Sequence, residues 1–207
     1  MAESEVAQEL PIDEVEIDDC EDEEPNPYYK TPEQKTMQEI LEADKDDESL
    51  RNYKSKLMGD KLHVVIDKDN PNKVLINKLE LHVEGKPEEN ISMDLKDLES
   101  LKNTTFEVVE DSKYKIVVLF HVQREIVTGL KYKQVAKRKG LTVETKNIMI
   151  GSYGPAENEQ CYTSSVEEAP KGMLARGVYN MKSTFIDDDK HEYLKFEWKL
   201  EIVKKRK

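Results

Sequence analysis

Side chains that could catalyse a reaction or hold a metal ion are present, but their spacing does not build a site. The four histidines are scattered and lack zinc-ligand spacing: they are His63, His82, His121 and His191. Residues 187–189 are three adjacent aspartates, which cannot all face one cation unless a loop is built for it. Residues 151–155 (GSYGP) contain glycines but lack the Lys-Ser/Thr ending of a phosphate loop. We therefore expect no enzyme, no cofactor and no metal site.

Charge is divided unevenly along the chain. The formal net charge is −12, yet residues 1–60 carry 20 acidic and 6 basic groups, which leaves 24 acidic and 26 basic groups in residues 61–207. An acidic segment repels phosphates, so nucleic acid is not an expected partner, whereas a basic protein surface is. Two basic runs, residues 131–139 and 204–207, could touch acidic lipid or act as nuclear signals. A solvated strand edge and a frayed terminus are the simpler interpretations.

The cysteines and the apolar runs of the sequence indicate the cellular compartment. The two cysteines, Cys20 and Cys161, have neither disulfide-framework nor metal-ligand spacing. There is no apolar run at the N-terminus, and none anywhere approaches the ~20 residues of a membrane helix. We expect a cytosolic protein that makes only transient contact with membranes.

The first 60 residues are predicted to form a tail and an arm. Residues 1–27 contain 12 acidic groups and no Lys or Arg, a composition typical of disorder. Within the arm, residues 28–60, the spacing of apolar residues predicts two short helices, at about residues 32–43 and 47–58. The second is highly charged and marginal by itself. It is either a solvated linker helix or a recognition element that orders on a partner.

From residue 61 the apolar period changes to two. Apolar and charged residues alternate most regularly from Leu194 to Ile202, and long alternating runs occupy residues 79–83 and 114–122. Shorter strands are predicted at 91–95, 106–108, 141–143, 148–150 and 179–185. Such strands, with turn signals between them and no long helix, predict a mainly β protein: an immunoglobulin-like antiparallel β-sandwich over residues 61–207, without the immunoglobulin cysteine pair.

Several long motifs then coincide with those of one family. They are residues 44–53 (DKDDESLRNY), 124–129 (REIVTG), 151–155 (GSYGP), 166–177 (VEEAPKGMLARG) and 185–198 (FIDDDKHEYLKFEW). In this order they resemble the Rho GDP-dissociation inhibitor family, from Tyr28 to the C-terminus.

That resemblance implies a partner and two sets of contact residues. Members of the family hold prenylated Rho-family GTPases, of the Rho, Rac and Cdc42 types and mainly GDP-bound, in a 1:1 complex away from membranes. The resemblance places the GTPase-binding residues at Tyr29, Ile40, Asp47, Ser49, Leu57 and Asp189. It places the residues that bind the geranylgeranyl group at Leu81, Leu101, Ile126, Leu174, Met181 and Trp198.

Two other classes of function were weighed against this one. A general carrier of prenyl or acyl groups would share the sandwich but would not need the switch-binding arm. An enzyme on a β-sandwich would need a convergent acid–base or metal set, and the sequence shows none.

Overall fold

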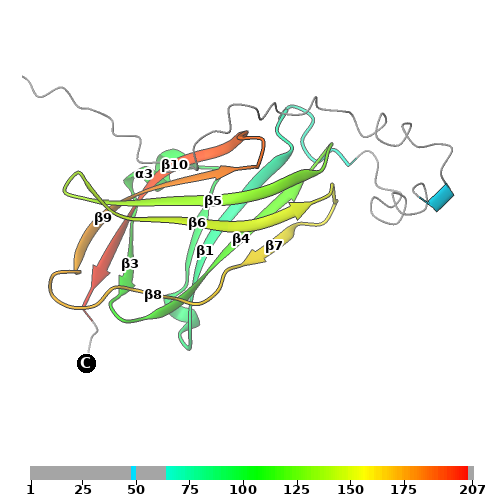
Figure 1. The fold of residues 1–207 in the computed structure, drawn as a ribbon. Coiled ribbons are helices and arrows are strands. Elements are labelled where there is room, and N and C mark those ends of the chain that lie inside the picture. The colour runs from blue at the N-terminus through cyan, green and yellow to red at the C-terminus, as the bar shows by residue number, and fades with distance from the viewer. Residues whose placement is uncertain (1–47, 50–63, 205–207) are drawn as a thin grey trace, which may run out of the picture. The chain divides into compact units, whose positions relative to one another are not determined.

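The computed structural model describes residues 48–49 and 64–204, and within them the chain is almost entirely β-structure (Figure 1). The strands are β1 (Val74–Val83), β2 (Ile91–Asp94), β3 (Thr105–Val109), β4 (Lys113–Val122), β5 (Val127–Arg138), β6 (Leu141–Tyr153), β7 (Gln160–Thr163), β8 (Glu167–Glu168), β9 (Gly177–Ile186) and β10 (Glu192–Val203). A 3-10 turn, η1 (Pro87–Glu89), and one short helix, α3 (Leu98–Asn103), lie between them.

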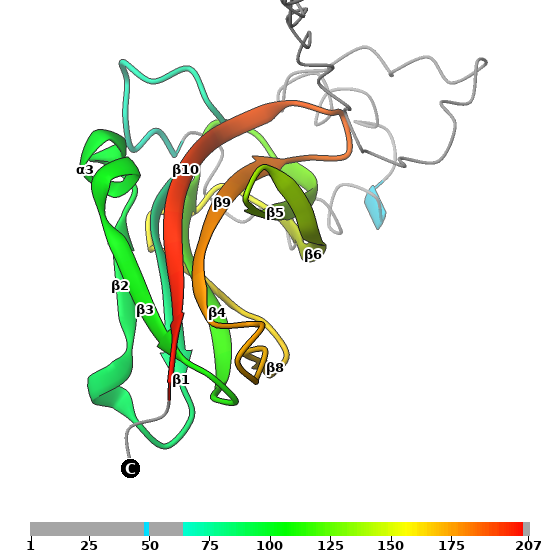
Figure 2. The ribbon, with the colours of Figure 1, turned by 90° about the vertical axis from the view of Figure 1, so that its left-hand side faces the viewer.

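The strands form two sheets that face each other (Figure 2). The first sheet has the order β2-β1-β4-β7, with β8 also paired to β4, and the second has the order β3-β10-β9-β5-β6. The prediction of a mainly β, two-sheet domain is confirmed. It is amended in one respect, because β3 runs parallel to β10, whereas the other paired strands of these two sheets are antiparallel.

Alternation along β10 explains why this strand was the clearest in the sequence. Phe196, Trp198 and Ile202 are buried between the sheets, while Lys195 and Glu197 are exposed on the outer face. A strand with one dry and one wet face shows this period of two because successive side chains point to opposite sides.

Three parts of the sheet region differ from the prediction. Residues 141–153 form one long edge strand, β6, rather than two short ones. The basic run at 131–139 lies largely within β5, between β6 and β9. Its inward positions include the polar Gln134 and the small Ala136, so the lysines on the other face dominate its composition. The helix α3 was missed as well; Asp97 caps it by accepting a hydrogen bond from Ser100 N (3.1 Å).

The core is densest where the first half of β5 faces β1 and β4. Tyr132 and Phe185 are neighbours on β5 and β9, with ring centroids 4.9 Å apart, and both are fully buried. On the opposite sheet Phe120 packs edge-on to Tyr153 at 5.0 Å. Large rings that meet across the sheets fill this end of the sandwich.

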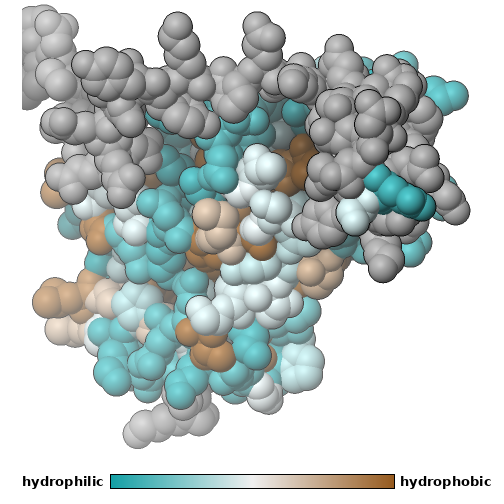
Figure 3. Space-filling model, turned by 45° about the vertical axis from the view of Figure 1, so that its right-hand side comes forward, coloured by the Kyte–Doolittle hydropathy of each residue, from teal (hydrophilic) through white to brown (hydrophobic). Residues whose placement is uncertain are grey.

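The predicted tail and both predicted arm helices lie outside the described residues, apart from Glu48 and Ser49, which are helical and exposed. Around the sandwich, the face shown in Figure 3 is mostly hydrophilic, with apolar side chains in separate spots.

Candidate functional site

A cavity of about 430 Å³ lies between the sheets, at the end away from the Tyr132–Phe185 pair. Its volume falls within the range of small-molecule pockets. Both sheets contribute to its walls. The apolar lining consists of Leu81 and Ile116 from the first sheet and of Ala136, Val143, Met181, Trp198, Leu200 and Ile202 from the second; Tyr114, Gln134, Glu144, Lys146, Glu168, Pro170 and Tyr179 complete it.

The cavity exists because side chains become smaller along the strands that form it. On β5 the inward series passes from Tyr132 through Gln134 to Ala136, and on β9 it passes from Phe185 through Ser183 to Met181. Ser183 Oγ lies 2.9 Å from Trp198 Nε1, which donates to it, and 2.9 Å from Tyr132 Oη. These bonds satisfy the polar atoms of two buried rings and hold Trp198 as a wall of the cavity.

A polar cluster crosses between the sheets beside the cavity. Lys146 on β6 forms an ion pair with Glu167 on β8, and its ammonium group lies 3.5 Å from Glu144 Oε1. Tyr114 on β4 donates to Glu167 Oε2 at 3.3 Å. We call these four residues the clasp. It joins β6 of one sheet to β4 and β8 of the other.

The clasp is charged at neutral pH. Burial disfavours the Lys146 ammonium, but Tyr114, Glu167 and Glu144 outweigh that effect and raise the pKa of Lys146 above its ordinary value. Burial also raises the pKa of Tyr114, so its hydroxyl remains a neutral donor.

The structure brings together three of the six predicted lipid-binding residues. Leu81, Met181 and Trp198 all line the cavity. Leu101 is buried on α3, which packs against β10 outside the cavity. Ile126 precedes β5 at the opposite end from the cavity and is 39% exposed, and Leu174 is 87% exposed in the loop before β9.

The sequence analysis missed several lining residues. Ile116, Leu200 and Ile202 share the inward face of strands that it did predict, so the period of two was a usable signal for them. Ala136 had no such signal, because it stands within a lysine-rich run.

Of the predicted GTPase-binding residues, Ser49 and Asp189 are described; Tyr29, Ile40, Asp47 and Leu57 lie outside the described residues. Asp189 is exposed in the turn between β9 and β10.

Hydrogen bonds to Asp187 hold the turn between β9 and β10 in place. The buried carboxylate of Asp187 accepts from His191 N (2.9 Å) and from Tyr193 Oη (2.6 Å). Burial and this bond raise the pKa of Tyr193.

The turn is also fastened to β5. Lys131 Nζ lies 2.8 Å from Asp188 Oδ1, and Asp188 N donates to Thr128 O at 3.1 Å. Gly129 has φ +59°, and a Cβ there would overlap the Asp188 carboxylate. A residue with a side chain at position 129 would therefore displace the turn that presents Asp189.

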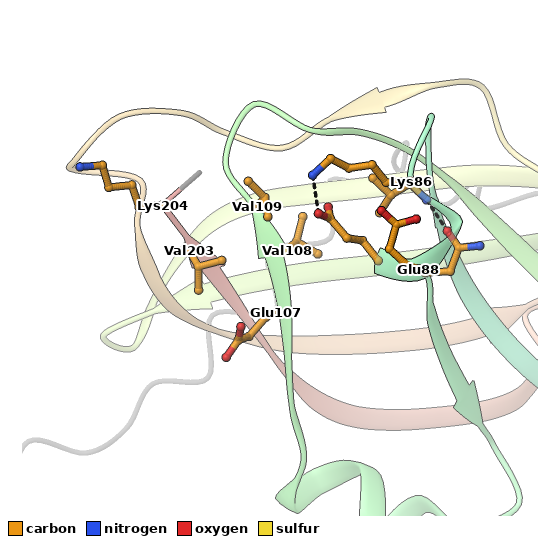
Figure 4. A pocket seen from close by; sticks show the side chains of 10 residues that line it. Lys86, Glu88, Glu107, Val108, Val109, Val203 and Lys204 are labelled. Atoms are coloured by element: carbon orange, nitrogen blue, oxygen red, sulfur yellow. Dashed lines mark hydrogen bonds and ion pairs between the residues drawn. The ribbon is translucent and has the colours of Figure 1, made fainter. Parts of the chain in front are cut away.

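A second hollow, of about 590 Å³, opens between η1 and the ends of β3 and β10 (Figure 4). Valines form part of its wall, but Lys86, Glu88, Glu107 and Lys204 also line it. Lys86 is paired with Glu89 beside it. This mixture of charges does not suit a hydrocarbon chain, whereas much of the lining of the smaller cavity between the sheets is apolar.

Among the described residues there is no cluster of three or more His, Cys, Asp or Glu that could bind a metal ion. The described helices include none that is long and apolar enough to cross a membrane.

Comparison with known proteins finds one family along most of the chain. The family described as "RHO protein GDP dissociation inhibitor" matches residues 14–205. Rho GDP-dissociation inhibitor 1 of Rattus norvegicus is 47% identical over 188 residues, 90% of this chain and 91% of that protein. The Homo sapiens protein of the same name is 48% identical over 185 residues, 89% of each chain.

One further protein of the same description and one solved structure were also found. A probable rho GDP-dissociation inhibitor of Caenorhabditis elegans is 46% identical over 178 residues, 85% of this chain and 92% of that protein. A Niemann-Pick type C2 protein from the Japanese carpenter ant, at TM-score 0.43 and 8% identity over 68% of this chain and all of that one, is too weakly similar to indicate a shared fold. The family match and these identities together show that the chain belongs to the Rho GDP-dissociation inhibitor family, whose members are inhibitory regulators and not enzymes.

Proposed function

We propose that this inhibitor holds Rho-family GTPases in the cytosol by burying their geranylgeranyl group in the cavity between the sheets. The observation that carries the proposal is that cavity, with an apolar lining from both sheets and with Trp198 fixed in its wall. Leu81, Met181 and Trp198 are the residues that contact the lipid. The partners are prenylated GTPases of the Rho, Rac and Cdc42 types, mainly GDP-bound, in a 1:1 complex with a monomer.

The other three predicted lipid-binding residues lie outside the cavity lining, and their proposed roles differ. Leu174, exposed in the loop between two lining segments, would meet the part of the lipid nearest the opening. Leu101 and Ile126 would reach the lipid only if the sheets part, and their roles remain predictions.

Lipid burial alone cannot remove a GTPase from a membrane. Each buried CH₂ contributes ~0.8 kcal/mol, so a 20-carbon chain gains on the order of 10 kcal/mol or more, and the bilayer offers about the same. Protein–protein contacts must therefore tip the equilibrium. We propose that the arm supplies them through Tyr29, Ile40, Asp47, Ser49 and Leu57, and that Asp189 supplies one from the sandwich. An arm that holds the switch regions would also slow GDP release.

A pair of substitutions tests the two parts separately. Ala136→Phe would fill the cavity and displace at least two CH₂ groups of the lipid, which should weaken lipid binding about tenfold or more. Val135→Phe, on the outer face of the same strand, is the matched control. Asp47→Ala removes a charged acceptor worth ~1.5–3 kcal/mol and should weaken binding of prenylated and unprenylated GTPase alike.

The measurements are extraction of prenylated GTPase from liposomes, binding of unprenylated GTPase, and a thermal melt of each variant. Ala136→Phe should impair extraction but spare binding of the unprenylated form. Extraction by a folded Ala136→Phe variant at the normal level would refute the cavity as the lipid site. If the parent and Asp47→Ala both extract other prenylated proteins as well as they extract Rho-family GTPases, the protein is a general prenyl or acyl carrier.

A further inference from the structure

Large apolar side chains are exposed around the opening of the lipid cavity. Leu141 is 73% exposed at the start of β6, and Met173 and Leu174 are 81% and 87% exposed in the loop before β9. Val143 is about half exposed on β6. We call these four residues the apolar rim. Isolated exposed apolar residues are ordinary, but a contiguous group at a cavity opening marks an interaction surface.

Arg138 holds the two halves of the rim together. From the end of β5, opposite Leu141, its guanidinium donates to the main-chain oxygens of Leu174 and, at 2.6 Å, of Arg176. The same group lies 5.3 Å from the ring centroid of Tyr179, a lining residue of the cavity. The β5–β6 turn and the loop before β9 are therefore one surface, on the end of the sandwich that faces the viewer in Figure 2.

The rim is continuous with the cavity. Val143 belongs to both, and the loop that carries Met173 and Leu174 runs from Pro170 to Tyr179, two lining residues. A hydrocarbon chain that leaves the cavity at this end passes directly over the rim.

Basic side chains flank the rim. Lys137 and Lys139 belong to the β5–β6 hairpin, and Lys171 begins the loop. Lys171 pairs with Asp111 at 3.2 Å, but both groups are largely exposed, so the pair is weak and exchangeable. The rim is not purely basic, since Glu168 also lines the opening; Glu110, by contrast, is engaged by Arg176 at 2.7 Å. Apolar tips beside lysines fit an interface with an anionic bilayer.

We propose that the apolar rim inserts into the surface of a membrane that contains anionic lipid, and so places the opening of the cavity against the acyl chains. This inference rests on the proposed function and adds the membrane-facing surface to it. A prenyl chain would then pass from bilayer to cavity without crossing water, where its whole hydrocarbon surface would be exposed.

The first experiment measures vesicle binding by the full-length protein without any GTPase. The vesicles contain equal parts of phosphatidylcholine and phosphatidylserine, and flotation gives the bound fraction. Leu141→Asp/Met173→Asp should lose about tenfold or more in affinity, because two apolar side chains no longer insert. Met149→Asp is the matched control: this methionine is also exposed on β6, but on the outer face, and its variant should bind like the parent. Lys137→Gln/Lys139→Gln should lose roughly fivefold per lysine, and only on anionic vesicles.

The second experiment locates the insertion. A Met173→Trp variant should be quenched by vesicles with brominated acyl chains, whereas Met149→Trp and the parent, whose one tryptophan is the buried Trp198, should not. Equal quenching of both variants, or none, would overturn the proposal. So would vesicle binding by Leu141→Asp/Met173→Asp at the level of the parent.

A third measurement separates this inference from the proposed function. Leu141→Asp/Met173→Asp should still bind a geranylgeranylated peptide in solution, yet extract prenylated GTPase from vesicles slowly. If the variant loses affinity for unprenylated GTPase in the absence of vesicles, the rim is a protein contact and the membrane proposal is wrong. If the parent binds vesicles as expected but never binds the peptide, the rim stands and the lipid cavity fails.

Discussion

The two ends of the space between the sheets are built differently from the same strands. At one end Phe120, Tyr132 and Phe185 are fully buried and fill the gap with aromatic rings. At the other end, the facing inward residues of β5 and β9 are Ala136 and Met181, four residues along each strand from Tyr132 and Phe185. There a cavity of about 430 Å³ remains between the sheets. One pair of sheets thus encloses a packed core along half of its length and a cavity along the other half.

This contrast shows how a small protein can maintain a hollow interior. An empty apolar cavity forfeits dispersion contacts and so destabilises the fold. The closed end supplies the packing that fixes the sheets relative to each other, and the clasp joins them beside the cavity through one ion pair. The cavity can then be lined by small or flexible side chains without collapse of the sandwich.

The largest effect should come from removing a ring at the closed end. Phe185→Ala should destabilise the protein by about 3–5 kcal/mol, because it empties a site that is completely packed. Met181→Ala, at the cavity wall, should cost less than about 2 kcal/mol, because part of that side chain already faces empty space. Thermal or urea unfolding of the two variants measures the difference. Equal losses at the two positions would mean that the cavity end bears as much of the stability as the closed end.

A smaller effect is expected at the clasp. In Lys146→Met the mostly buried Glu167 carboxylate keeps only the hydrogen bond from the Tyr114 hydroxyl. The free energy of unfolding should therefore fall by about 1–3 kcal/mol. The double variant Lys146→Met/Glu167→Gln should recover part of that loss, since no unpaired charge remains. Because the clasp restrains the edge between β6 and β8, we also expect the single variant to take up a geranylgeranylated peptide faster.

The clasp prediction is checked by a double-mutant cycle in urea and by stopped-flow fluorescence of Trp198. Lys195→Met removes a lysine whose nearest carboxylate, that of Glu192, is 4.0 Å away on the exposed face, so it serves as the control and should change neither measurement. An additive cycle would show that Lys146 and Glu167 do not stabilise the fold as a pair.

The strands β4 and β10 were easier to predict from sequence than the cavity wall on β5. Apolar and charged residues alternate strictly over residues 194–202, and residues 114–122 carry an apolar or aromatic residue at every second position, so the inward faces of both strands were identified. The cavity wall on β5 could not be identified in this way. Its inward residues, Gln134 and Ala136, are not strongly apolar, because a cavity needs small side chains rather than large ones.

The resemblance supplied residues that periodicity could not, and the structure brings only some of them together. Leu81, Met181 and Trp198 were predicted from the family's motifs and line the cavity. No pattern in the sequence predicted the clasp. Lys146 and Glu167 are 21 residues apart and meet only because β6 and β8 lie on facing sheets. Contacts of this kind depend on sheet topology, which one sequence does not reveal.

The smallest effect at neutral pH concerns the ionisation of two buried tyrosines, Tyr132 and Tyr193. Burial raises the pKa of Tyr132 at the closed end, although the hydrogen bond with Ser183 opposes the shift, and the pKa of Tyr193 is raised as well. A tyrosine whose pKa is higher in the folded than in the unfolded protein contributes its full stability below pH ~10 and loses it as the pH rises toward the folded value. Stability should therefore be constant near neutrality and fall above pH ~10.

Tyrosinate absorbance and far-ultraviolet circular dichroism, followed together, should show Tyr132 ionising only as the sheets unfold. Tyr132→Phe loses a hydrogen bond worth about 1 kcal/mol near neutral pH, yet should unfold at a higher pH than expected from that loss. If the alkaline transition of Tyr132→Phe simply follows its lower stability, the closed end is not what limits the protein at high pH, and the polar turn around Tyr193 is the better candidate.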